Sequence, residues 1–131
     1  MEYSHTDYSQ FPIVVIKFAN FEPTVAQFDA YLKQMEHMYT NYEQFIIVFD
    51  ATDTKYLSGE LRAKQAEWIK ANTAMIKQNC KGMVYVLPNI AIELIFKCIV
   101  AFSPLPVPYK TCRSLQDGIK EGEKLFSQPS M

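Results

Sequence analysis

Phe45-Ile46-Ile47-Val48-Phe49-Asp50 is a short, continuous run of apolar residues that ends on an acid. A run of this length, rich in β-branched residues, is typical of a strand that is buried on both faces of a sheet. Pro12–Phe18 and Met83–Leu87 have the same character, and Tyr109–Cys112 predicts a short final strand. Tyr3–Tyr8 alternates more weakly between apolar and polar residues and is a candidate edge strand.

Segments with helical spacing separate these runs. Apolar residues recur every three or four positions from Val25 to Tyr42, and Thr24 with Gln27 forms a capping box at the start. Further helices are predicted over Ser58 to about Asn79, Ile90–Phe102, and Ser114 to about Phe126. Alternating strands and helices imply right-handed crossovers and a mainly parallel sheet. We expect one open α/β domain over residues 1–131, with an ordered core at about 8–126 and four or five strands.

Composition places the chain in a broad class. It has 131 residues, 49% of them hydrophobic, and 13 basic against 14 acidic side chains give a net charge of −1. This balance gives no global attraction for nucleic acid. The three cysteines form no CxxC pair, and the polar, acidic N-terminus lacks a secretory pattern, so we expect reduced thiols and a cytoplasmic protein. The longest apolar run, Ile90–Phe102, is too short to span a bilayer.

The usual signatures of cofactor sites and catalysis are not found in the sequence. The two histidines lie far apart, and the four glycines form neither a P-loop nor a GxGxxG turn. No serine is flanked as GxSxG, and no partner base is adjacent to Cys80, Cys98 or Cys112 that would make it a nucleophile. We therefore predict a protein without metal, cofactor or catalytic residue.

A polar segment that follows the buried run at 45–50 is the first candidate site. Ligands of open α/β sheets gather at the carboxyl ends of the strands, where this segment begins. Ser58 lies at a predicted helix start, where free amides and the helix dipole stabilise an anion, and Arg62 follows one turn later. The segment predicts a site for a protein partner or a small anion. Its candidate residues are Asp50, Thr52, Asp53, Thr54, Ser58, Gly59 and Arg62.

The alternative for this segment is a purely structural role. Ser58 would then be only the cap of the helix, and Asp50–Thr54 only a hydrogen-bonded turn. The sequence leaves both interpretations open.

The helix predicted over Ile90–Phe102 is the second candidate site. Glu93 and Lys97 form its polar line and are spaced for an ion pair. The opposite side is expected to cover the sheet, with Cys98 buried in the core. The apolar residues beside the polar line, together with the proline-rich connector, predict a surface for a partner subunit or an acyl chain. The residues of this surface are Ile90, Phe96, Val100, Leu105 and Val107. That neighbouring elements cover them is the open alternative.

The element order, with Phe45–Asp50, Tyr56–Trp68 and Pro104–Tyr109, resembles the STAS domain, in its bacterial anti-sigma-factor-antagonist-like (SpoIIAA-like) branch. Some schemes group this branch with CRAL-TRIO lipid carriers. The resemblance covers about residues 8–126 and implies a non-enzymatic module with a regulatory protein partner. Antagonists of this kind carry a strand-end Asp and a phosphorylated Ser-Ser-Gly at a helix start. Asp50 and Ser58-Gly59 match these positions, but the loop is shorter and Leu57 replaces the first serine.

Three functions follow as hypotheses. The first is an interaction module that uses the Asp50–Arg62 segment and self-associates, as a homodimer, through an apolar helix surface. The second is a carrier or sensor of a lipid or other apolar molecule, which uses the helix at 90–102. The third is an acid–base enzyme in which Asp50 and Asp53 act as a pair.

Overall fold

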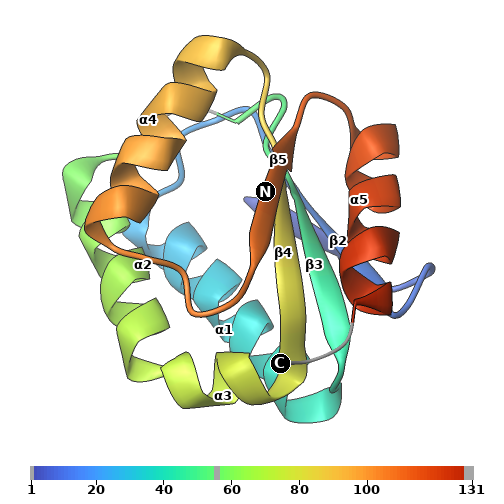
Figure 1. The fold of residues 1–131 in the computed structure, drawn as a ribbon. Coiled ribbons are helices and arrows are strands. Elements are labelled where there is room, and N and C mark those ends of the chain that lie inside the picture. The colour runs from blue at the N-terminus through green and yellow to red at the C-terminus, as the bar shows by residue number, and fades with distance from the viewer. Residues whose placement is uncertain (1, 55–56, 129–131) are drawn as a thin grey trace.

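The computed structural model describes residues 2–54 and 57–128 and contains a five-stranded sheet with helices on both faces (Figure 1). The strands are β1 (Ser4–Asp7), β2 (Ile13–Phe18), β3 (Phe45–Asp50), β4 (Cys80–Val86) and β5 (Tyr109–Cys112). The helices are α1 (Val25–Asn41), α2 (Gly59–Ala71), α3 (Thr73–Asn79), α4 (Ile90–Phe102) and α5 (Leu115–Ser127). The predicted open α/β fold is confirmed.

The strands lie side by side in the order of the sequence. Strand β1 pairs antiparallel with β2 and forms one edge, and the other neighbouring pairs are parallel. Because the crossovers between parallel strands advance in one direction and are right-handed, their helices must lie on the same face. Figure 1 shows this arrangement, with α1 to α4 on one side of the sheet and α5 on the other.

This arrangement crowds the face that carries α1 to α4. Helices about 10 Å across need about 30 Å for the three crossovers, whereas parallel strands about 4.8 Å apart give β2–β5 a width of only about 15 Å. The crossover helices therefore cannot all lie flat on the sheet. Helix α2 packs against α1 and α3, and α4 stands over the edge formed by β4 and β5.

The opposite face is closed tightly by α5. A Cβ atom added at Gly118 would lie 2.9 Å from Val86 Cγ2 and 3.1 Å from Val48 Cγ1, closer than side-chain carbons pack. The absence of a side chain at this glycine lets the helix approach the sheet. Leu125 is buried with the strand residues on this face.

The long helix predicted from Ser58 to Asn79 is interrupted, so that prediction is wrong at Asn72. The side-chain amide of Asn72 donates to the Trp68 carbonyl at 2.8 Å, and the Thr73 hydroxyl donates to the Ile69 carbonyl at 2.8 Å. Polar side chains that bond to the backbone compete with regular helix bonds. Helix α2 ends before Asn72, whose φ and ψ are −112° and 17°, and α3 begins after it.

Candidate functional site

A cavity of about 280 Å³ lies between α2, α4 and the sheet. Its walls come from four residues of α2, Arg62, Gln65, Ala66 and Ile69, and from Ile92, Ile95, Phe96, Ile99 and Val100 of α4. Leu105, on the proline-rich connector, also lines it. The cavity occupies the space that the crowded crossover helices leave above the sheet.

An aromatic row forms the floor of the cavity. The rings of Phe18 and Phe49 stack with centroids 6.1 Å apart, and those of Phe49 and Tyr85 with centroids 4.9 Å apart. Phe96 of α4 continues the row, with its ring centroid 4.4 Å from that of Tyr85. Because β2, β3 and β4 are neighbours, one aromatic residue from each strand is enough to build a continuous apolar surface.

Tyrosine side chains add hydroxyl groups to this apolar lining. Tyr3, Tyr31 and Tyr85 all line the cavity. Desolvation by burial raises the pKa of Tyr3 to about 12, and it also raises the pKa values of Tyr31 and Tyr85. Burial disfavours the charged phenolate, so these hydroxyls stay protonated at neutral pH. The Tyr85 hydroxyl donates to the Met83 sulfur at 3.5 Å.

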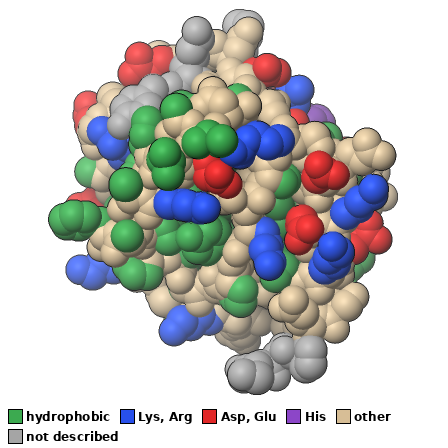
Figure 2. All heavy atoms as spheres, turned by 45° about the horizontal axis from the view of Figure 1, so that its top comes forward, with side chains coloured by type: hydrophobic (Ala, Val, Ile, Leu, Met, Phe, Trp, Pro, Cys, Tyr) green, Lys and Arg blue, Asp and Glu red, His purple; other side chains and the backbone are tan. Residues whose placement is uncertain are grey.

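The lining residues that are exposed mark the opening of the cavity. Arg62 and Ala66 of α2 and Ile95 and Ile99 of α4 are exposed, whereas the floor residue Phe49 is buried. The cavity therefore opens between the two helices. Figure 2 shows hydrophobic side chains gathered on the left half of the face it presents, the side on which α4 lies in Figure 1.

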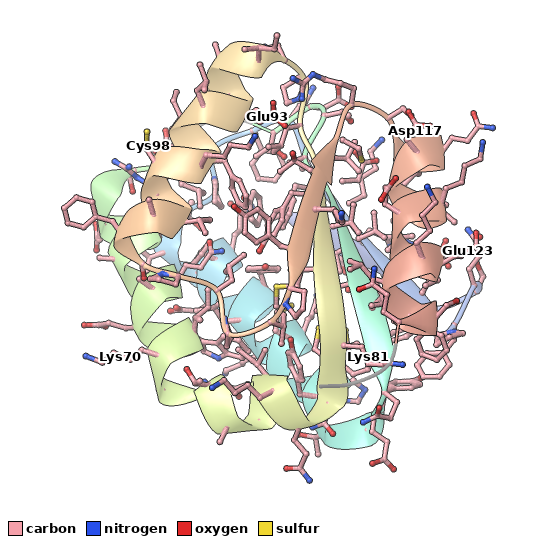
Figure 3. All side chains as sticks on the ribbon, viewed as in Figure 1. Lys70, Lys81, Glu93, Cys98, Asp117 and Glu123 are labelled. Atoms are coloured by element: carbon pink, nitrogen blue, oxygen red, sulfur yellow. The ribbon has the colours of Figure 1, made fainter. Side chains whose placement is uncertain are left out.

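Helix α4 has no buried residue, although it is the most apolar helix. Leu94 is 59% exposed and Phe102 is 96% exposed. The prediction that Cys98 is buried in the core is wrong, because it is exposed and directed away from the sheet (Figure 3). The reason lies in the direction of the side chain: Cys98 is on the side of α4 that faces away from the sheet and from the cavity, so the apolar sequence around it does not bury it.

Hydrogen bonds of Glu93 connect the first turn of α4 to Thr111 of β5 and to Arg113, the residue after β5. Glu93 accepts hydrogen bonds from the Thr111 hydroxyl and from Arg113 Nη2, the latter at 3.1 Å. These bonds hold the pKa of Glu93 below its usual value. Glu93 thus pairs with Thr111 and Arg113 in place of the predicted partner Lys97. The spacing of residues within the helix could not reveal these partners, which lie about twenty positions away in the sequence. Figure 3 shows Glu93 directed toward β5.

Most polar residues of the first candidate site have local structural partners. Asp50 is buried, and its Oδ1 accepts from the Thr52 hydroxyl at 2.7 Å. Asp53 is exposed and pairs with Lys17 at 3.8 Å. Ser58 Oγ accepts from the Leu61 backbone N–H at 3.3 Å and caps α2. Gly59 is the first residue of α2. Phosphorylation of Ser58 stays a prediction, and residues 55–56 of this segment lie outside the described residues.

The two candidate sites meet at the cavity. Thr54 and Arg62 from the first line it, as do Phe96, Val100 and Leu105 from the second. Two residues of the second site do not line it. Ile90 is 65% exposed, and Val107 packs against the core cluster on the α1 side. The pair Asp50 and Asp53 does not line it either, and each carboxylate has a different partner.

The residues that build the floor, chiefly Phe18, Phe49 and Tyr85, were not predicted as site residues from the sequence. Each belongs to one of three consecutive parallel strands, near its carboxyl end. The sequence did contain one indication of the floor, an aromatic residue at or next to the last position of each of these strands. Their register, which pairs Phe49 with Tyr85, follows only from the sheet itself.

The described part of the chain has neither a candidate metal cluster nor a candidate membrane span. No group of three or more His, Cys, Asp or Glu residues within 2–54 and 57–128 could hold a metal ion. Over the same residues, no helix has the length and apolar character needed to cross a membrane.

Comparison with known proteins gives a structural match but no sequence match. No family model and no curated protein matches the sequence. An uncharacterized protein of the DUF3478 family with a SpoIIAA-like fold, from Shewanella loihica PV-4, matches with a TM-score of 0.67 and 13% identity over 91% of each chain. An anti-sigma factor antagonist from Mycobacterium paratuberculosis matches with a TM-score of 0.57 and 11% identity over 92% of each chain. The chain therefore has a SpoIIAA-like fold, as its resemblance to the STAS domain predicted.

Proposed function

We propose that this protein is a binding module that takes up an apolar small molecule in the cavity between α2 and α4, without chemical turnover. The cavity itself carries the proposal, because it is open, mostly apolar and lined by aromatic rings. Ligand sites are typically concave, apolar surfaces with a few polar groups that fix orientation. Of the three hypotheses, the carrier or sensor fits this geometry best.

The size of the cavity supports a ligand rather than a packing defect. Protein interiors contain few voids larger than a water molecule, and a dry apolar cavity of about 150 Å³ is large enough for benzene. At about 280 Å³ this cavity is nearly twice that volume. Filling it would remove the half-buried rings of Tyr85 and Phe96 from water without disturbing their contact with each other.

The polar groups of the first candidate site favour this function over the other two. Asp50 is hydrogen-bonded within its turn, and Ser58 caps α2. These partners favour the purely structural interpretation of that segment. Asp50 and Asp53 are engaged separately, which does not favour an acid–base pair. One of the structural matches is an anti-sigma factor antagonist, so we further propose that ligand uptake regulates contact with a protein partner.

Binding of an uncharged apolar compound tests the proposal. We expect 1-decanol to bind the wild-type protein in isothermal titration calorimetry with one site per chain. Phe96→Asp should abolish binding, because it places a carboxylate in the apolar wall. Phe102→Asp is the matched control, since it makes the same change on the same helix at a residue that is 96% exposed and outside the cavity. No binding to wild type, or equal loss in both variants, would refute the proposal.

Self-association through the outer side of α4 is the second candidate function. Ile90 and Leu94, one turn apart, are 65% and 59% exposed, and Phe102 is 96% exposed. Such a stripe can pair with its own copy around a two-fold axis. Sedimentation velocity should show a dimer that Leu94→Asp converts to monomer. A monomer at all concentrations would contradict this candidate and leave the binding module unaffected.

A further inference from the structure

Arg62 is the only charged residue among the described residues that line the cavity. It is exposed and lies in the first turns of α2, at the opening, whereas the floor consists of Phe18, Phe49, Tyr85 and other apolar or aromatic residues. The cavity thus has a cationic residue at its opening and an aromatic floor, to which the tyrosines add only neutral hydroxyl groups. This polarity would orient an amphiphilic ligand in a single direction.

Further polar groups lie on the helix that carries Arg62 and on the connection that leads into it. Gln65 and Arg62 are three residues apart on α2 and both line the cavity, as expected for neighbours on one helix face. Thr54, on the connection that leads into α2, has a buried hydroxyl with no hydrogen-bond partner among the described residues. A buried hydroxyl without a partner is destabilising, and a ligand that bonds to it removes this penalty.

The charge at the opening selects the head group of the ligand. Nη2 of Arg62 lies 4.0 Å from the position that a Cβ atom of Gly59 would occupy, so the guanidinium is held beside the first turn of α2. A guanidinium matches a carboxylate through two parallel hydrogen bonds. No described lining residue is acidic, so none repels an anion, and none adds a second cation for a doubly charged group.

The volume of the cavity bounds the apolar part. If about 150 Å³ accommodates the six carbons of benzene, then the 280 Å³ measured here accommodates about eleven heavy atoms. A saturated chain of about nine carbons fills this space and leaves a carboxyl group at the opening.

We propose that the ligand is a monocarboxylate with an apolar body of about nine carbons, whose carboxylate binds Arg62 and whose body lies on the aromatic floor. This inference rests on the proposed function, because it assigns the ligand class of the same cavity. Uncharged apolar molecules of the same length would enter the cavity but lack the contact with Arg62.

Titration with decanoate and 1-decanol, each below its solubility or micelle limit, tests the inference. Arg62→Gln should weaken decanoate binding by about 10- to 100-fold, the usual range for losing a charge-assisted pair. The same variant should change 1-decanol binding by less than about twofold. Lys70→Gln is the matched control, because Lys70 is another exposed cation of α2 that lies outside the cavity and points away from it (Figure 3). It should change neither affinity.

The outcomes separate this inference from the proposed function. If 1-decanol binds and Arg62→Gln leaves decanoate unchanged, or weakens both compounds equally, the head-group assignment is overturned while the cavity remains a binding site. If Lys70→Gln weakens decanoate as much as Arg62→Gln does, the effect is general surface charge and the assignment is likewise overturned. If neither compound binds wild type, both proposals fall. Thermal unfolding of each variant establishes that it is folded.

Discussion

Truncation of Phe96 should loosen α4 and lower the stability of the whole protein, although α4 contains no buried residue. The Phe96 ring contacts Tyr85, with centroids 4.4 Å apart, and Tyr109, with centroids 5.6 Å apart. Each aromatic pair contributes about 0.5–1.5 kcal/mol, and partial burial of a phenylalanine contributes about 1 kcal/mol more. We therefore expect Phe96→Ala to lower the free energy of unfolding by about 2–4 kcal/mol.

Urea denaturation followed by circular dichroism measures this change. Phe102→Ala removes the same side chain from the same helix, but Phe102 is 96% exposed, so its free energy of unfolding should change by no more than about 0.5 kcal/mol. Equal effects of the two substitutions would refute the reasoning, because α4 would then not be attached through Phe96. A fall below about 1 kcal/mol for Phe96→Ala would refute it as well.

Three further predictions address other parts of the structure. Hydrogen bonds from Thr111 and Arg113 lower the pKa of Glu93 in the folded protein below its unfolded value of about 4.5. The stability that Glu93 contributes is therefore fully present above pH 4.5, and it is lost as the pH falls through the lower pKa of the folded state. Urea denaturation between pH 6 and 3 should show a steeper loss of stability in wild type than in Glu93→Gln. Gly118→Ala forces a Cβ atom to within 2.9 Å of Val86. It should lower the free energy of unfolding by about 1–2 kcal/mol. Gly59→Ala should have little effect, because the new Cβ atom would lie 4.0 Å from Arg62 Nη2, an ordinary contact distance. Affinity for straight-chain alcohols should rise about fourfold per methylene up to about nine or ten carbons and then level off, and calorimetry that showed a continued rise would exclude a cavity of this size.

Local patterns were sufficient to predict the fold. The apolar runs at 12–18 and 45–50 are strands because their length and β-branched composition suit a buried position in a sheet. The capping box of Thr24 and Gln27 begins α1 as expected, with both of its hydrogen bonds formed. The break at Asn72 escaped prediction because helical spacing continues through it. Only the competing side-chain bonds of Asn72 and Thr73 interrupt the helix.

Individual residues of the candidate site could be predicted from the sequence, but the cavity that brings them together could not. Arg62 and Phe96 were both singled out, for different reasons and in different hypothetical sites. That they line one cavity depends on how far α4 stands from the sheet, and this follows from crowding of the crossover helices rather than from either segment. Cys98 is exposed although the sequence around it is apolar, because its side chain lies on the side of α4 that faces away from the sheet.

The location of a bound apolar molecule tests the central claim most directly. We would record intermolecular nuclear Overhauser effects between 1-decanol and the aromatic and methyl protons of the protein. The account predicts contacts from the alkyl chain to the rings of Phe49 and Tyr85 and to the methyl groups of Val100, all of which line the cavity. Contacts confined to Leu94 and Phe102 on the outer side of α4 would contradict it, because they would show adsorption to an exposed surface in place of entry into the cavity.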